Sequence, residues 1–193
     1  MKMFKLCLVF LIALLLLNCG KVYTERFRAS SELLRDIKKI AVLPLNDLTG
    51  GENIAAVIGK LISHEMNMKY GVEVIEGDEL QRLFREKKIE MDEIPNRALA
   101  QRTAESLEVD GVIYGDILEY RYRKWVTRSR GVSEDPVVSL SLRMVNGKTG
   151  TVVFSGTTVR SNYEVFTTGR DPLSAVAEMA VADLVKSMKI NKK

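Results

Sequence analysis

The first twenty residues constrain this chain most, because they decide which part of it is available to fold as a domain. Lys2 and Lys5 precede an almost unbroken apolar run over residues 6–17. A basic start followed by a short apolar run is typical of a secretory signal peptide, and this run is shorter than the roughly 20 residues that a membrane-spanning helix needs. We therefore expect residues 1–18 to direct export and to be cleaved off.

A cysteine follows the apolar run. Leu16-Leu17-Asn18-Cys19 resembles the lipobox of bacterial lipoproteins, in which the thiol receives diacylglycerol and the new amine a further chain such as palmitate. Each buried methylene of such chains adds about 0.8 kcal/mol to membrane binding, so several chains anchor a protein stably. The resemblance implies lipidation at Cys19, and Gly20 after it implies an outer-membrane anchor with the domain facing the periplasm. The alternative is an uncleaved signal anchor with an incidental cysteine.

Charge and cysteine content narrow the function classes. The chain has 29 basic and 25 acidic side chains, and removal of the two signal lysines would leave 27 against 25, a net charge of +2. Such a balance does not favour a nucleic-acid partner. Of the two cysteines, Cys7 would be removed and Cys19 acylated, which leaves neither a disulfide nor a cysteine metal site. The stability of the mature domain must therefore come from packing.

Hydrophobic periodicity predicts one domain over residues 37–190. Residues 19–36 are expected to be the acylated cysteine and a short polar tether, in which residues 20–35 show no clear period and reach about 50 Å if fully extended. Within the domain, apolar runs and alternating patterns predict strands at residues 38–45, 72–75, 112–126, 137–145 and 151–160. Apolar side chains spaced by three and four predict helices at residues 53–70, 78–88, 96–107 and 171–188. We expect a polar turn over residues 127–136.

The resulting order, β-α-β-α-α-β-β-β-α, predicts an α/β (α+β) fold in which helices pack on a mixed β-sheet. In the strand over residues 112–126, alternation places Leu118, Tyr120 and Tyr122 on one face. Glu119, Arg121 and Arg123 are expected on the other. In the strand over residues 137–145, Val138 and the apolar residues that alternate with it are expected to face the core.

A search for catalytic groups favours a protein that is not an enzyme and has no cofactor or metal. His64 is the only histidine, and no spacing supplies it with catalytic or zinc partners. The Gly147-Lys148-Thr149 sequence lies in a predicted hairpin, and Gly50-Gly51 lacks the lysine of a phosphate-binding loop. Three carboxylates near strand ends are explained by caps and turns, with a small α/β site as the alternative, namely Asp47, Asp110 and Asp116.

One basic and aromatic cluster is the candidate site, because arginine and tryptophan are frequent anchors of interfaces. It could bind a protein partner or anionic lipid head groups. The alternative is a solvated strand edge whose cations discourage edge pairing. The cluster follows one strand and its loop: Arg121, Arg123, Lys124, Trp125, Arg128 and Arg130.

Four segments together resemble a known family. They are Ile40–Leu45 with Asn46 and Gly50, Val72–Ile75 with residues 78–80, Leu107–Asp116, and Leu140–Val145 with residues 148–150. Their order and spacing resemble the periplasmic domain shared by the curli secretion lipoprotein (CsgG) family and the LpoB-type lipoprotein activators of penicillin-binding proteins, which is related to the N-terminal domain of TolB. The resemblance implies a non-catalytic interaction module in cell-envelope or secretion assembly.

Three functions remain open at this point. The first is an envelope interaction module that forms homo-oligomers or binds an envelope protein. The second is a subunit of a CsgG-type export channel, or a regulator of a peptidoglycan synthase. The third is a nucleotide-binding protein that would use the loop after the first strand. An arginine-rich strand with one short loop at residues 115–150 and a short tether fit the first of these better than the second.

Overall fold

The computed structural model describes residues 22–28, 33–34, 37–91, 94–127, 131–161 and 172–190. At residues 22–24, 125, 127 and 131–133, the description covers the backbone alone. The signal sequence and Cys19 lie outside the described residues.

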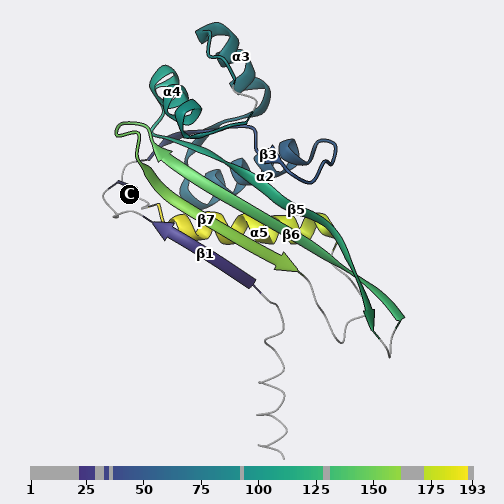
Figure 1. Cartoon of the computed structure of the whole chain (residues 1–193). Helices are drawn as coiled ribbons and strands as arrows, with labels where there is room; N and C mark the ends of the chain where they lie inside the picture. The colour runs from purple at the N-terminus through teal and green to yellow at the C-terminus, as the bar shows by residue number, and fades with distance from the viewer. Residues whose placement is uncertain are drawn as a thin grey trace, which may run out of the picture.

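The described residues form one mixed sheet of seven strands with helices on both faces (Figure 1). The strand order is β1-β7-β6-β5-β2-β4, and β3 pairs with β5 beyond the end of β2. The strands are β1 (Val22–Arg28), β2 (Lys39–Val42), β3 (Asn46–Asp47), β4 (Glu73–Ile75), β5 (Gly111–Thr127), β6 (Gly131–Asn146) and β7 (Val152–Ser161). The helices are α2 (Ile54–Tyr70), α3 (Gly77–Lys87), α4 (Arg97–Leu107) and α5 (Leu173–Met188). The α/β fold expected from the sequence is confirmed.

Strand β5 joins the two halves of the sheet. Its first residues pair in parallel with β2, which pairs in parallel with β4. Its whole length pairs antiparallel with β6, and β6 and β7 continue the antiparallel half. The parallel strands need crossover connections, which α2, α3 and α4 supply, whereas β5, β6 and β7 follow one another in the chain with only short connections between them. This arrangement follows the predicted order of elements.

The larger core lies between the sheet and helices α2 and α5. The apolar stripe of α2, with Ile58, Ile62 and Met66, packs there with the stripe of α5. From the sheet, the alternating side chains of β6 fill this core with no exposed surface, namely Val138, Leu140, Leu142 and Met144. The two helices are also joined by a hydrogen bond of 2.9 Å from the Tyr70 hydroxyl to the carbonyl oxygen of Val185.

A smaller core lies on the opposite face, under α3 and α4. Leu80 and Phe84 of α3 and Leu99 of α4 pack against side chains at the β4-β2-β5 end of the sheet. The Asn96 side chain caps α4 by accepting a hydrogen bond from the backbone N–H of Leu99 at 3.0 Å. Helix α3 starts at Gly77, with Glu76 as the cap residue, rather than after Asp78 as the sequence suggested. These two helices cover only one end of this face.

A β-bulge at Leu118 changes the alternation of β5. Ile117 pairs with Leu140 and Glu119 pairs with Ser139, so Leu118 has no partner on β6 and is 42% exposed. One extra residue reverses the side to which the following side chains point. Tyr120 therefore packs on the larger core with Ile117, and Glu119 lies on the opposite face. The expectation that Leu118 shares a face with Tyr120 is wrong, because the bulge lies at that residue.

The expected tether is partly a strand. Residues 22–28 form β1, which pairs antiparallel with β7 from Val22 opposite Arg160 to Arg28 opposite Phe154. Local sequence did not show this strand, because its side chains do not alternate cleanly and its pairing partner is more than 120 residues away. Further along, Leu34 is buried and Asn146 donates a hydrogen bond to the carbonyl oxygen of Leu33 at 3.0 Å. The described parts of the segment before residue 37 therefore belong to the folded domain.

The prediction of a polar turn over residues 127–136 is also wrong, because most of this segment belongs to strands. Strand β6 begins at Gly131 and pairs with β5 up to Thr127, so the β5–β6 hairpin extends past the end of β7. The sequence did not predict a strand here, because this part of β6 is polar and contains Pro136. That proline lies just outside the last β6–β7 pair, between Val137 and Ser161, where a missing N–H removes no hydrogen bond to β7.

None of the helices that the structure describes is long and apolar enough to cross a lipid bilayer.

Two glycine substitutions test the packing of this sheet. In Gly115→Ala, the new Cβ would collide with the backbone carbonyl of Ser141 on β6, and overpacking of this kind costs about 1–3 kcal/mol. In Gly59→Ala, within α2, the new methyl group would meet only a Glu76 carboxylate oxygen at 3.6 Å. Because alanine favours a helix interior over glycine by about 1 kcal/mol, this control should be stabilising. Chemical denaturation should give opposite signs for the two variants, and equal effects would contradict the close strand contact.

Candidate interaction surface

The face of the sheet opposite α2 and α5 is the candidate site, and we call its part beyond α3 and α4 the open face. Helices α3 and α4 pack over the other end of this face. Strand register places on it Glu119, Arg121 and Arg123 of β5, Ser139, Ser141 and Arg143 of β6, Ser155 and Thr157 of β7, and Glu25 and Phe27 of β1. Small polar side chains fill its centre, where Thr157 donates a hydrogen bond to the Ser141 hydroxyl at 3.3 Å.

Two arginines converge on one carboxylate at the hairpin end of the open face. Arg121 Nε lies 2.8 Å from Glu119 Oε1, and an Nη of Arg123 lies 2.7 Å from Oε2 and 3.0 Å from Oε1. The three residues alternate along β5, so they lie in line on the same side of the strand. Glu119 is only 17% exposed, whereas Arg121 is 66% exposed. We call this group the Glu119 cluster; its outer surface is guanidinium.

A second carboxylate lies one step back along β5, on the same face. Asp116 accepts a hydrogen bond from the Asn46 side chain at 3.2 Å and lies 3.4 Å from Nη1 of Arg143 on β6. The guanidinium carbon of Arg143 lies 5.9 Å from the centre of the Tyr114 ring, which is within cation–π range. The open face therefore presents a row of arginines, each held in place by a carboxylate or an aromatic ring beside it.

The environment shifts the ionisation of two members of this row. Burial of Glu119 opposes its ionisation, but the hydrogen bonds and positive charges of Arg123 and Arg121 outweigh burial and hold the Glu119 pKa below its ordinary value. Burial raises the pKa of the Tyr114 hydroxyl, although the charges of Arg143 and Arg97 oppose this increase. At neutral pH, Glu119 is thus an anion and Tyr114 a neutral hydrogen-bonding group.

The structure separates the residues of the predicted cluster. Arg121 and Arg123 lie together on the open face, as expected. Lys124 points to the other face, where its Nζ lies 3.3 Å from Oε1 of Glu134. The side chain of Trp125, together with Arg128 and Arg130, lies outside the described residues, as does the lipidation site Cys19.

Sequence reasoning missed the acidic partners of this surface. Glu119 was placed on the arginine face, but its role as their common partner was not predicted. Asp116 was assigned to a cap or turn, and it does bind the Asn46 side chain, yet it also pairs with Arg143. The signal that could have found these groups is the spacing by two of Glu119, Arg121 and Arg123 along β5, which places an acid on the same face as the two bases. The pairing with β6 was needed to place Arg143 beside them.

The β5–β6 hairpin has a second feature, on the face away from the arginines. Tyr122 is 46% exposed and Val126 is 85% exposed, and both lie on the same side as Lys124. The Tyr122 hydroxyl accepts a hydrogen bond of 3.3 Å from the backbone N–H of Leu173, at the start of α5. Beyond this contact the hairpin extends past α5 and β7, as the right side of Figure 1 shows. Its described tip therefore carries apolar surface exposed to solvent.

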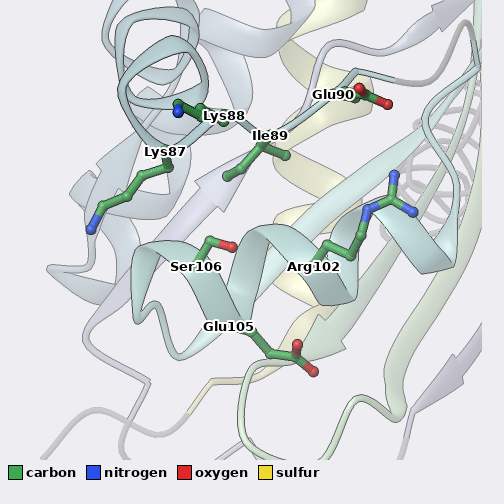
Figure 2. A pocket seen from close by; sticks show the side chains of 7 residues that line it. All are labelled: Lys87, Lys88, Ile89, Glu90, Arg102, Glu105 and Ser106. Atoms are coloured by element: carbon green, nitrogen blue, oxygen red, sulfur yellow. The ribbon is translucent and has the colours of Figure 1, made fainter.

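A hollow of about 470 Å³ lies between the end of α3 and the middle of α4 (Figure 2). Its rim has three cationic and two anionic side chains, and Figure 2 shows Arg102 and Glu105 pointing away from opposite sides of α4. The site is open and its charges are mixed. We therefore assign it no ligand.

The other sequence candidates have structural explanations. His64 is exposed on α2. Asp110 accepts hydrogen bonds from the backbone N–H groups of Lys38 and Lys39 at 2.8 and 3.0 Å, and Asp47 accepts one from the N–H of Thr49 at 2.8 Å. The Asp47 contact confirms a turn residue, whereas Asp110 makes a long-range contact that holds the start of β2 beside the start of β5. Among the described residues, no three metal-ligating side chains are grouped.

Comparison with known proteins shows the fold. No protein-family model matches the sequence, and no curated protein matches it significantly. Among solved structures, the PelC dodecamer from Paraburkholderia phytofirmans is similar, with 19% identity, a TM-score of 0.64, and coverage of 89% of this chain and 100% of that chain. Lipoprotein GNA1162 from Neisseria meningitidis has 18% identity and a TM-score of 0.52, over 80% of this chain and 99% of that one.

A further match is the C-terminal domain of LpoB from Escherichia coli, with 14% identity over 66% of this chain and 83% of that one, and a TM-score of 0.46. That score is too low to support an argument about function. Identities of this size show a common fold and nothing more. The resemblance to bacterial lipoproteins is thus confirmed for the fold, whereas the resemblance to CsgG stays a prediction.

The charge of Glu119 leads to a pH prediction. Because its folded-state pKa is lowered, its contribution to stability is present above the ordinary glutamate pKa of about 4.3 and is lost as the pH falls through the lower, folded-state value. Glu119→Gln should lower the free energy of unfolding at pH 7 by about 1 kcal/mol, and the difference from wild type should shrink in acid. Denaturant titrations between pH 7 and pH 3 would measure this difference in the free energy of unfolding.

Glu86→Gln is the matched control. Glu86 also lies 2.7 Å from an arginine, Arg82, but both side chains are more than half exposed on α3. A pair of this kind contributes at most about 0.5 kcal/mol. Equal losses in the two variants would contradict the special position of Glu119.

Proposed function

We propose that this protein is a lipid-anchored component of the bacterial cell envelope that works by assembling with further copies of itself, and with envelope proteins, through the open face. Cys19 supplies the anchor and the outer membrane is its location. The protein performs no catalysis in this proposal. The Glu119 cluster is the centre of the contact.

The observation that supports assembly most directly is the similarity to PelC, which is a dodecamer and whose chain is covered over its full length by this one. The similarity to a lipoprotein, GNA1162, supports the anchor, since it comes in addition to the lipobox-like sequence before Cys19. Both similarities are of fold, so assembly and anchoring of this chain are proposals.

The chemistry of the open face suits a protein contact. Exposed guanidinium groups are among the commonest interface anchors, because they donate several hydrogen bonds in a fixed geometry and also stack on aromatic rings. Here Glu119 and Asp116 hold Arg121, Arg123 and Arg143 in fixed positions on a rigid sheet. Less side-chain entropy is then lost on binding. The partner surface should supply carboxylates or backbone carbonyl groups to the remaining guanidinium donors.

A subunit of an oligomeric export channel is the second candidate. One structural observation favours the channel. The β5–β6 hairpin is longer than the alternation of apolar and polar residues predicted, and it extends past the rest of the sheet. Regulation of a peptidoglycan synthase stays an alternative that rests on the resemblance to LpoB-type activators.

Charge reversal on the open face tests the proposal. The acylated wild-type protein, extracted in mild detergent, should have the native mass of a multimer. Arg121→Glu combined with Arg123→Glu places three carboxylates together and should shift the mass to that of a monomer or dimer. Native mass spectrometry or light scattering would measure the change, and circular dichroism would check folding.

The matched control reverses two exposed arginines of α3, with the same change of net charge: Arg82→Glu combined with Arg85→Glu. It should leave the multimer intact. A monomeric wild type would contradict assembly, and an open-face variant that stays a multimer would remove this face from the contact.

A further inference from the structure

We propose that the outer part of the β5–β6 hairpin, around Tyr122 to Val126, enters the interfacial layer of the membrane to which Cys19 is anchored, and so forms a second membrane contact. Its membrane-facing side chains are Tyr122 and Val126, with Lys124 between them. This inference rests on the proposed lipid anchor.

Strand register places the anchor and the hairpin at the same end of the sheet. Val22, the first residue of β1, pairs with Arg160 of β7, which pairs with Val138 of β6, which pairs with Tyr120 of β5. Tyr120 is therefore the position on β5 that is level with the start of β1. Figure 1 shows the start of β1 and the hairpin tip at the same lower-right side of the sheet, although the twist between strands turns their directions apart.

The hairpin extends further beyond the start of β1 than the link between Cys19 and β1 can span. From Tyr120 to Thr127, β5 continues for seven more residues, about 23 Å at 3.3 Å per residue. Between Cys19 and Val22 there are only two residues, so this link spans about 10 Å at most. An acylated Cys19 is held at the bilayer surface. When this end of the sheet faces the bilayer, the hairpin lies along the surface or enters it, which is the orientation that we propose.

The side chains on the hairpin fit an interfacial position. Val126 is 85% exposed and Tyr122 is 46% exposed, on the same face of the ribbon. Tyrosine is favoured at membrane interfaces because its ring is apolar and its hydroxyl is polar. Lys124 lies on this face too, and a long lysine side chain can extend along apolar surface while its ammonium group reaches water or lipid head groups.

Three described cations of the outer hairpin have carboxylate partners, which lowers the cost of bringing the hairpin near lipid. Lys124 lies 3.3 Å from Glu134 across the hairpin, and Arg121 and Arg123 share Glu119. The arginine pairs lie on the opposite face of the ribbon from Val126. On the Tyr122 and Val126 side, a shallow insertion therefore brings Lys124 near lipid together with its partner Glu134 rather than as an isolated charge.

A residue of β1 that lies far from Cys19 serves as the control for membrane contact. Phe27 is 58% exposed and lies five residues further along β1 than Val22, toward the opposite end of the sheet. It should stay away from the lipid when the anchor is in the bilayer, whether or not another copy covers it. Because the mature chain would have no free thiol once Cys19 is acylated, a cysteine at either position is unique.

The experiment labels full-length acylated Val126→Cys and Phe27→Cys with a polarity-sensitive fluorophore in vesicles that contain lipids spin-labelled near the head group. We expect emission at shorter wavelength from position 126 than from the free label in water, and several-fold stronger lipid quenching at position 126 than at position 27. Circular dichroism confirms that both variants are folded. Vesicle flotation and the mass of the N-terminal peptide report separately on the anchor.

Each other outcome identifies what has failed. If the protein floats with the vesicles but neither position is quenched, the hairpin inference is overturned and the anchor stands. Emission at shorter wavelength without quenching at position 126 would mean that another protein copy covers the hairpin, which also overturns it. An unmodified Cys19 in a protein that does not float would overturn the proposed anchor and this inference together.

Discussion

The pairing of β5 with β6 is the interaction on which the rest of the structure depends. The ladder runs from Gly111 opposite Asn146 to Thr127 opposite Gly131. Its inner part sets the positions of both cores, since β5 also pairs with β2 and β6 also pairs with β7. Its outer part has no neighbouring strand among the described residues and forms the hairpin. One ladder thus supports the packed domain and continues beyond it, so the orientation of the tip is fixed by the core.

The bulge at Leu118 divides these two parts and determines what each face presents. Before it, alternate β5 side chains such as Ile113 and Ile117 enter the larger core. After it, the reversed alternation keeps Tyr120 on the core side and turns Glu119 and the two arginines to the open face. Without the extra residue, Glu119 would point toward the apolar core and Tyr120 away from it. The charged row and the apolar side of the hairpin therefore have the same structural cause.

Most elements could be predicted from local patterns, because each core helix and each buried strand has a sustained period in its own sequence. The expectations failed where pairing is non-local and the pattern is short. Strand β1 alternates poorly, and what forms it is the exposed edge of β7. The outer part of β6 is polar, and its partner across the hairpin decides its conformation. On the open face, the arginines could be found from composition, whereas Arg143 could be joined to Asp116 only through strand register.

The two edges of the sheet favour assembly through faces over assembly through strand addition. At one edge, β1 presents exposed charged side chains at Glu25, Arg26 and Arg28, and charges of this kind discourage pairing with another sheet. At the other edge, β4 has only three residues, too few for a stable added strand. Strand addition also continues without limit unless the geometry closes, whereas a contact between fixed surfaces at a constant angle can close into a ring. A protein whose edges are protected and whose arginine row is rigid is therefore suited to an assembly of defined size.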